Sequence, residues 1–234
     1  MKPNQTWKVV EHGTLERLAD NLYSVTGTLD MPLGETVRRM TIAKLADGRL
    51  VVFSAIALDE QEMAKVDALG SVAFLVVPSG IHRLDIKGWT QRYPDARVIA
   101  PAGAREKVEE LVKVDATTVA LTDRRVKLLT IPGTGEQEMA MLVTTGTKKT
   151  LVLADLIFNL PAQHGFARFA FTLLGFGPGH PTQPALVRMR LVKDKDAMRE
   201  QLRAWANDAG LERILVSHGD PIEKPREALL ALAA

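Results

Sequence analysis

Four polar residues that can bind a metal ion follow apolar stretches of the sequence, at the points where those stretches end. They are His82 and Asp85 after Val72–Val77, Asp155 after Thr150–Leu153, and His218 after Arg213–Val216. We expect each stretch to form a buried strand, and α/β proteins place their binding groups just beyond the carboxyl ends of such strands. Two imidazoles and two carboxylates that converge there would suit a divalent metal such as zinc, iron or manganese.

A structural role for each of these four residues is the alternative, because short polar residues are common after strands. Asp155 could cap the turn that follows it, and His82 could bind a backbone carbonyl. Two further histidines, His164 and His180, are candidate replacement ligands in a segment rich in glycine and proline. His12 is predicted to lie exposed in the N-terminal arm.

Serine catalysis and phosphate binding have little support in the sequence. Ser54 and Ser79 lack the Gly-x-Ser-x-Gly pattern of a hydrolase nucleophile. Gly175–Pro181 lacks a preceding strand and the Lys-Ser/Thr ending of a phosphate loop. Four phenylalanines lie near this segment, namely Phe166, Phe169, Phe171 and Phe176. They could form an apolar lid over a pocket, but large apolar side chains more often fill a core, which we favour here.

The composition is that of an ordinary globular protein: 234 residues, 46% hydrophobic, 25% charged, with a formal net charge of +2. We expect one domain over residues 1–234. No basic, aromatic-interleaved run suggests a nucleic-acid partner. The absence of cysteine excludes disulfides, thiolate zinc ligands and cysteine nucleophiles. The N-terminus does not resemble a signal peptide and no apolar stretch could span a bilayer, so a cytoplasmic location is expected.

Strands and helices are predicted to alternate in the first half of the chain. Asp47-Gly48 predicts a tight hairpin between the strands Arg38–Lys44 and Arg49–Ile56. Asp59 should cap a helix that ends at Gly70, because its side chain can accept an N–H group of the first turn. The later predicted elements are the helices Trp89–Tyr93 and Ala104–Val114 and the strand Arg97–Ala100. This alternation argues for α/β layering.

The second half is predicted to begin with strands and to end with helices. The strands are Thr117–Leu121, Val126–Ile131, Met139–Thr144, Thr150–Leu153 and Arg213–Val216, and the helices are Asp194–Ala209 and Glu223–Ala233. The first of these helices carries Met198, Leu202 and Trp205 at helical spacing on one face. Asn159–Gln183 is irregular and rich in glycine, proline and phenylalanine.

The order of these features resembles the metallo-β-lactamase superfamily, from about Leu15 to Pro221. The features are the opening strands in Arg17–Gly27, the Asp-Gly hairpin, the His82 loop, the turn Ile131-Pro132-Gly133, the strand end Leu153-Ala154-Asp155 and the segment Ser217-His218-Gly219-Asp220. The resemblance implies an α/β fold, a four-layer αββα sandwich of two mixed sheets with helices outside. Trp89 and Asp155–Asn159 look closest to a divergent branch with degenerate ligand motifs.

The metal-ligand motif of the family, Thr-His-x-His-x-Asp-His, is only partly present. His82 stands at its second histidine, Asp155 at the later bridging aspartate and His218 at the final histidine. The departures are Gly80 at the first histidine, Leu84 at the aspartate, Asp85 at the last histidine and Thr134 in the later Pro-Gly-His turn. The resemblance therefore implies one metal rather than two, held by His82, Asp85, Asp155 and His218.

A metal-dependent hydrolase of an unknown small substrate is the leading functional hypothesis, because a metal ion lowers the pKa of a bound water. The departures at Gly80, Leu84 and Thr134 favour the alternative, a catalytically inactive, metal-free member of the fold that binds a ligand or a protein. A third possibility is a redox or oxygen-handling role with iron. The expected partner is a small molecule, with no nucleic acid and no membrane, and the oligomeric state is not predicted.

Overall fold

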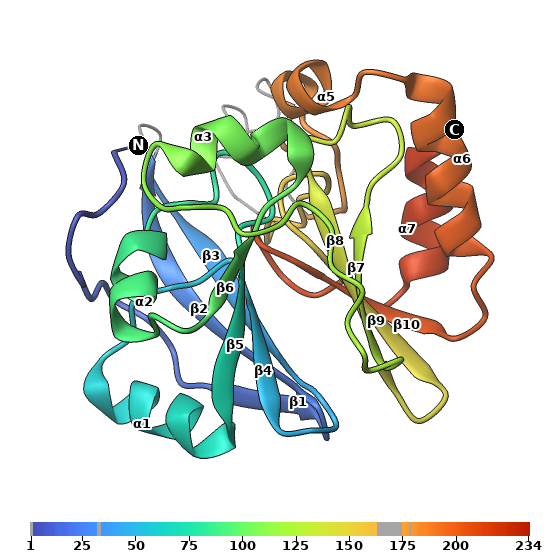
Figure 1. The fold of residues 1–234 in the computed structure, drawn as a ribbon. Helices are drawn as coiled ribbons and strands as arrows, with labels where there is room; N and C mark the ends of the chain where they lie inside the picture. Colours follow the sequence, from blue (N-terminus) through green and yellow to red (C-terminus); the bar gives the residue numbers. More distant parts are fainter. Residues whose placement is uncertain (1, 32–33, 163–174, 178) are drawn as a thin grey trace.

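Two β-sheets lie face to face in the computed structural model, which describes residues 2–31, 34–162, 175–177 and 179–234 (Figure 1). Helices cover the outer face of each sheet, so the layers run helix, sheet, sheet, helix. The four-layer αββα sandwich expected from the sequence is therefore confirmed.

The first sheet contains six strands in the order β1-β2-β3-β4-β5-β6. They are β1 (Glu16–Ala19), β2 (Leu22–Met31), β3 (Gly34–Lys44), β4 (Arg49–Phe53), β5 (Ser71–Val76) and β6 (Arg97–Ile99). Strands β1 to β4 pair antiparallel, whereas β4, β5 and β6 pair parallel. The predicted Asp47-Gly48 turn joins β3 to β4, and Gly48 has the positive φ, 85°, that favours glycine there.

The second sheet contains four strands in the order β10-β9-β8-β7. They are β7 (Val126–Thr130), β8 (Met139–Thr145), β9 (Lys148–Leu153) and β10 (Leu211–Val216). Strands β7, β8 and β9 pair antiparallel, and β9 pairs parallel with β10. Each sheet therefore contains neighbouring parallel strands whose carboxyl ends share one edge.

The described helices lie on the outside of the sandwich. They are α1 (Glu60–Leu69), α2 (Ile86–Arg92), a 3₁₀ turn (Ala102–Ala104) leading into α3 (Arg105–Glu109), α5 (Ala185–Leu191), α6 (Lys195–Ala206) and α7 (Pro225–Leu232). Helices α1 to α3 pack on the first sheet, and α6 and α7 pack on the second (Figure 1). As predicted, Asp59 caps α1, accepting the Glu62 N–H at 2.8 Å. Within the described residues, no helix is long and apolar enough to cross a membrane.

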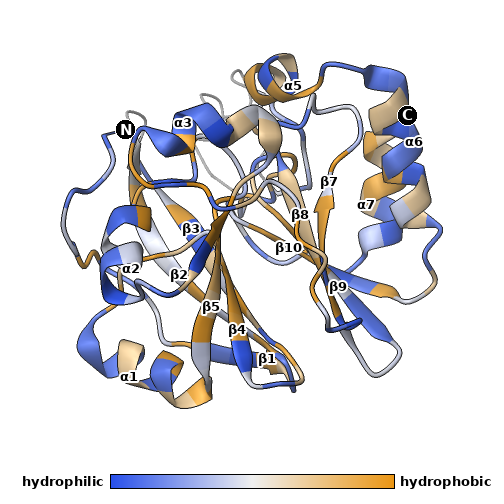
Figure 2. Cartoon of the chain, in the orientation of Figure 1, coloured by the Kyte–Doolittle hydropathy of each residue, from blue (hydrophilic) through white to orange (hydrophobic). Residues whose placement is uncertain are grey.

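Three apolar cores hold the four layers together, one between the sheets and one beneath each helical layer (Figure 2). Strand β4 contributes to two of them: Leu50 and Val52 face the helices, and Val51 and Phe53 face the second sheet. A strand buried on both faces reads as a continuous apolar run rather than an alternating one. This double burial explains why the sequence showed uninterrupted apolar stretches before the candidate ligands.

The strand predicted over Thr117–Leu121 is wrong. Only Ala116, just before it, makes an isolated bridge, to Ile99 of β6. Val119 and Leu121 instead pack, partly buried, against the core between the sheets without pairing. The β-propensity of this segment reflects a fit to apolar surroundings rather than a backbone preference, so packing alone could satisfy it.

Several other boundaries also differ from the predictions. Helix α3 ends at Glu109 rather than Val114, and α2 begins at Ile86, ahead of Trp89. Strand β4 ends at Phe53 rather than Ile56 because Ser54 has a φ of 57°, outside the strand region. Helix α5 was not expected, because it follows directly on the irregular segment.

Candidate metal centre

The carboxyl ends of four strands bring the candidate residues together. Strand β4 ends just before Ser54, β5 leads into the His82 loop, β9 ends two residues before Asp155, and β10 ends two residues before His218. Strands β4 and β5 are parallel, as are β9 and β10, so these ends point to one side of the sandwich. One ligand atom each from His82, Asp155 and His218 lies within 4.8 Å of the other two.

His82 is held between a hydroxyl and a carboxylate. Its Nδ1 lies 2.7 Å from Ser54 Oγ, and its Nε2 lies 3.0 Å from Asp155 Oδ1. The side chains of His82 and Asp155 are only 7% and 3% exposed. A hydroxyl can donate or accept, so Ser54 can bind Nδ1 in either tautomer of the ring. The Ser54 contact therefore fixes the orientation of the ring, with Nε2 directed at Asp155.

His218 has a tautomer that its surroundings dictate. Its Nδ1 lies 2.9 Å from the Val37 carbonyl oxygen, which can only accept, so Nδ1 carries a proton. In the neutral ring Nε2 then has a lone pair, and it lies 3.5 Å from Asp155 Oδ1. A lone pair beside a carboxylate oxygen is repulsive unless a proton or a metal cation lies between them. The pair is therefore arranged for a positive ion.

Neighbouring residues fix the position of His218. Phe158 stacks on the imidazole with ring centroids 5.0 Å apart and planes 14° from parallel. Gly219 follows at a φ of 113°, and a Cβ atom there would lie 2.0 Å from the Asn159 carbonyl oxygen. Only glycine can therefore occupy the position after His218 without moving the backbone.

Ser54 has a strained backbone. Its φ of 57° lies in the left-handed region, which costs a non-glycine residue roughly 1–2 kcal/mol. Its N–H donates to Val76 O at 3.0 Å, which holds it against the end of β5. Strain of this kind persists only where the surroundings impose it, and here it places the hydroxyl against His82.

Asp155 is a buried carboxylate with partners on both oxygens. Oδ2 accepts the Ser79 hydroxyl at 2.9 Å, while Oδ1 faces the two histidines. Burial raises the pKa of Asp155, but the neighbouring imidazoles of His82 and His218 outweigh burial and hold the pKa below its usual value. The carboxylate therefore stays ionised at neutral pH.

Glu138 supports the backbone around Asp155. Its Oε1 accepts the N–H groups of Ala154, Asp155 and Leu156, each at 3.1 Å, and the residue is fully buried. Burial raises the pKa of the Glu138 carboxyl well above its usual value, and the neighbouring Asp155 carboxylate raises it further. Glu138 thus fixes the turn after β9 and, through it, the position of the Asp155 side chain.

Asp85, the fourth predicted ligand, is not part of this cluster. Its Oδ2 accepts from Arg38 Nη1 at 2.5 Å, and its Oδ1 accepts from Asn4 Nδ2 at 2.7 Å. The side chains of Arg38 and Asp85 are 8% and 2% exposed, so this is a buried ion pair. The structure therefore gives the Asp85 carboxylate a cation from β3 and an amide from the N-terminal arm as partners.

Two of the positions at which the sequence departs from the family motif provide no ligand. Gly80 has no side chain, and a Cβ atom there would lie in ordinary van der Waals contact with Lys107, 3.4 Å from its Cβ and Cγ. Thr134 is fully buried, and its hydroxyl donates to Ile131 O at 2.8 Å. Neither position presents a ligand atom to the cluster.

The other histidines do not join the cluster. His180 is exposed, and His164 lies outside the described residues. The prediction that His12 is exposed is wrong, because its side chain is 6% exposed and its Nε2 accepts the Asp59 N–H at 3.0 Å. Of the proposed aromatic lid, Phe166, Phe169 and Phe171 lie outside the described residues. Phe176 packs edge-on against Phe158, with ring centroids 5.5 Å apart.

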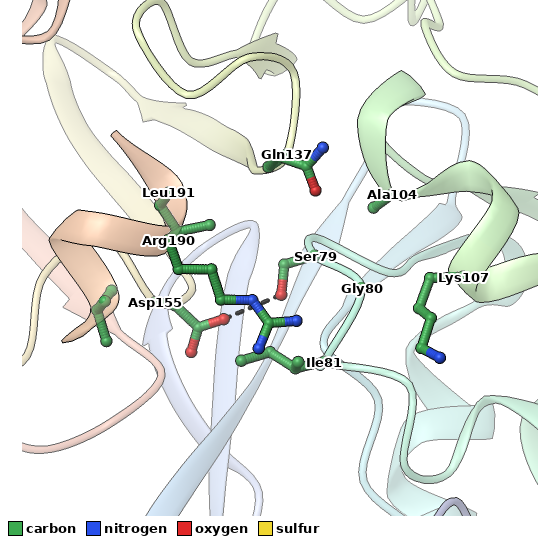
Figure 3. A pocket seen from close by; sticks show the side chains of 10 residues that line it. Ser79, Gly80, Ile81, Ala104, Lys107, Gln137, Asp155, Arg190 and Leu191 are labelled. Carbon is green, nitrogen blue, oxygen red and sulfur yellow. Dashed lines mark hydrogen bonds between the residues drawn. The ribbon is translucent and has the colours of Figure 1, made fainter. Parts of the chain in front are cut away.

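A pocket of about 230 Å³ opens beside the cluster (Figure 3). Asp155 and Ser79 contribute to its wall, together with Arg190 of α5 and Lys107. The remaining wall consists of the apolar side chains of Ile81, Ala104, Val187 and Leu191, together with Gly80 and the polar Gln137. A small molecule bound here would lie against the Asp155 carboxylate.

Sequence reasoning missed two residues that hold the cluster. Ser54 follows a buried strand just as His218 does, so the same strand-end argument could have found it. Glu138 gave no signal, because a single acid at the start of an apolar strand usually faces solvent. Ser54 and Ser79 were both considered only as nucleophiles, whereas Ser54 contacts His82 and Ser79 donates to Asp155.

Known structures share this fold over nearly the whole chain. The DIM-1 metallo-β-lactamase exposed to ceftazidime superposes with a TM-score of 0.64 and 11% identity, covering 97% of this chain and 98% of its own. A metallo-β-lactamase from Hirschia baltica superposes with a TM-score of 0.60 and 12% identity, covering 94% and 98%. No protein-family model matches the sequence, and no curated protein matches it. The chain thus has the metallo-β-lactamase fold, and the resemblance noted in the sequence is confirmed at that level.

Proposed function

We propose that this metallo-β-lactamase fold holds one divalent metal ion on His82, Asp155 and His218 and hydrolyses a small substrate. The observation that carries the proposal is the pairing of His218 with Asp155. The Val37 carbonyl leaves the His218 Nε2 lone pair directed at a carboxylate oxygen 3.5 Å away, and a cation between them would turn repulsion into attraction.

The spacing of the donor atoms supports this assignment. Zinc bonds of about 2.0–2.1 Å in a tetrahedral site place neighbouring donor atoms about 3.3 Å apart. The Asp155 Oδ1 atom lies 3.0 Å from His82 Nε2 and 3.5 Å from His218 Nε2, on either side of that value. In addition, the second nitrogen of each ring is bound to oxygen, the usual way in which proteins orient histidine ligands.

A single ion is favoured over two. Two positions that carry ligands in the family motif carry none here: Gly80 has no side chain, and the buried Thr134 hydroxyl donates to Ile131 O. Asp85, which could have replaced a lost ligand, has Arg38 as its partner. Three protein ligands also leave a coordination position for water or substrate, as in catalytic rather than structural zinc sites.

Each residue of the cluster has a defined task in this proposal. A divalent ion would act as a Lewis acid and would lower the pKa of a water molecule. Ser54 and the Val37 carbonyl hold the two imidazoles in place, and Ser79 holds the second oxygen of Asp155. The apolar wall of the pocket excludes water from the substrate, which strengthens electrostatic interactions within it.

The identity of the metal is a separate question. Two imidazoles and one carboxylate suit zinc, and the same donor set with open positions suits non-haem iron. Iron would permit redox chemistry in place of hydrolysis, so metals must be compared directly.

A metal-free binding protein is the second candidate, and one observation favours it. Asp155 already has Ser79, His82 and His218 within reach of its two oxygens, so the cluster can persist as a hydrogen-bonded network. In that case the pocket binds a ligand without reaction.

Metal binding separates the two candidates. Chelator-treated protein is titrated with Zn²⁺, Fe²⁺ (without oxygen) and Mn²⁺, and stoichiometry, affinity and melting temperature are recorded. We expect about one equivalent of one metal to bind and to raise the melting temperature. Binding of less than a tenth of an equivalent of every metal would reject the proposal and leave the binding protein.

Variants locate the site. His82→Ala and His218→Ala should each lose metal binding, whereas His180→Ala should bind as the unaltered protein does. His180 is the matched control because it is exposed and outside the cluster. Loss of binding in the control would place the ion elsewhere.

A further inference from the structure

The pocket beside the cluster contains an arginine that forms no ion pair within the described part of the chain. Arg190 extends from α5 into the pocket (Figure 3). Among the residues that the structure describes, it has no ion-pair partner, unlike Lys107, whose Nζ lies 2.7 Å from Glu110 Oε1. The Asp155 carboxylate, on the same wall, is already engaged by Ser79, His82 and His218. Arg190 is therefore the group free to bind an anion.

The rest of the pocket favours an apolar body. It is lined by the apolar side chains of Ile81, Ala104, Val187 and Leu191, and Gln137 is the one further polar side chain among the lining residues. Val187, Arg190 and Leu191 are spaced three and four residues apart, so α5 presents them on one face. The volume of about 230 Å³ lies below the roughly 300–1,000 Å³ of typical ligand sites, which indicates a small molecule rather than a polymer.

From these observations we infer that the substrate class is a small amphiphilic anion, with its anionic group on Arg190 and its apolar chain or ring against Ile81, Val187 and Leu191. A guanidinium binds a carboxylate or a phosphate through two parallel N–H groups, which fixes the orientation of the molecule. The apolar part of the bound molecule then lies between Arg190 and the cluster, so that the bonds next to its anionic group face Asp155. This inference rests on the proposed function only in calling the bound molecule a substrate.

Binding of simple probes tests the charge requirement. Chelator-treated protein is titrated by calorimetry with hexanoate, hexyl phosphate, hexanamide and hexylammonium. We expect the two anions to bind and the neutral and cationic compounds to bind at least about tenfold more weakly, because a hydrogen bond to a charged group exceeds a neutral one. The comparison of hexanoate with hexyl phosphate identifies the anionic group that fits better.

A chain-length series tests the apolar wall. Affinity should rise roughly threefold to fourfold for each methylene from acetate to hexanoate, the gain expected for burying a CH₂ group. Val187→Ser should flatten this dependence and leave acetate binding unchanged.

Neighbouring arginines of the same helix provide a matched pair of variants. Arg190→Gln should weaken hexanoate at least about tenfold and bring it close to hexanamide, and Arg190→Lys should recover part of the loss. Arg188→Gln also removes one positive charge from α5. Because Arg188 does not line the pocket, the affinity for hexanoate should not change in this variant. Both positions are exposed, so neither variant should impair folding.

The outcomes separate this inference from the metal proposal. Equal affinity for hexanoate and hexanamide, or equal losses in Arg190→Gln and Arg188→Gln, would overturn the amphiphilic-anion inference even if one metal ion binds. Conversely, anion-selective binding that depends on Arg190 in protein that binds no metal would support the inference while rejecting the hydrolase.

Discussion

Replacing Asp85 with asparagine separates its predicted role as a metal ligand from the ion pair that the structure shows. In the structure, the Asp85 carboxylate binds Arg38, and the ion pair is buried: the Arg38 side chain is 8% exposed and that of Asp85 is 2% exposed. Asparagine keeps the size of the side chain and the contact with Asn4 but removes the negative charge. We therefore expect Asp85→Asn to lower stability and to leave metal affinity unchanged.

The magnitude follows from the burial of the arginine. Within the described residues, Arg38 Nε and Nη2 have no hydrogen-bond partner, so Asp85 provides the only acceptor for a buried guanidinium. Removing one partner of a buried ion pair costs about 3–5 kcal/mol. For a chain of this length 1 kcal/mol corresponds to roughly 2–4 °C, so the melting temperature should fall by about 6–20 °C.

Calorimetric unfolding and competition titration of zinc measure the two effects in the same protein. Asp20→Asn is the control, because its ion pair with Arg17 is exposed and should change the free energy of unfolding by less than about 1 kcal/mol. The double replacement Arg38→Met with Asp85→Leu should recover much of the stability, since apolar residues can substitute for a buried pair. A tenfold loss of zinc affinity in Asp85→Asn, or an unchanged melting temperature, would refute this reasoning.

Three further predictions concern the support of the cluster and the edge of the sandwich. Glu138→Ala leaves three buried N–H groups without an acceptor and should cost about 3 kcal/mol, whereas Glu138→Gln keeps the acceptor oxygen and should cost about 1 kcal/mol or less in denaturant titrations. Ser54→Ala and Ser54→Gly should both weaken zinc binding about 10- to 100-fold. The glycine variant should melt higher than the alanine variant because it relieves the left-handed strain, and the reverse order would contradict that strain. Hydrogen bonds from Arg125 lower the pKa of Asp123 to about 2, so this residue contributes stability above the unfolded pKa that is lost as the pH falls from about 4 to about 2. The stability difference between the unaltered protein and Asp123→Asn should therefore shrink over that range in acid-unfolding titrations, and a constant difference would contradict it.

The sequence predicts most of the fold because buried strands leave a strong pattern. Val72–Val77 and Arg213–Val216 are apolar on both faces since each lies between a helical layer and a second sheet, and the polar residues after them mark the edge where parallel strands end. Thr117–Leu121 is also rich in β-branched and apolar residues but pairs with no strand, and composition alone does not reveal whether a pairing partner is present. The conformation of Thr117–Leu121 therefore depends on how Val119 and Leu121 pack against the core between the sheets.

The candidate site was predictable only in part, for reasons that its residues make clear. His218 was found because it lies two residues after β10, and His82 because it lies in the short loop that follows β5. Asp85 lies three residues beyond His82, at the start of a helix, where its direction depends on Arg38, 47 residues earlier in the chain. Arg190 could not be predicted, because its role depends on where α5 packs.

A crystal structure of the protein with zinc, with anomalous data collected at the zinc edge, tests the central claim most directly. We predict a single anomalous peak, about 2.0–2.2 Å from His82 Nε2, an Asp155 carboxylate oxygen and His218 Nε2, with Asp85 still paired to Arg38. A peak bound by Asp85, two peaks, or no peak between the two histidines would contradict the account.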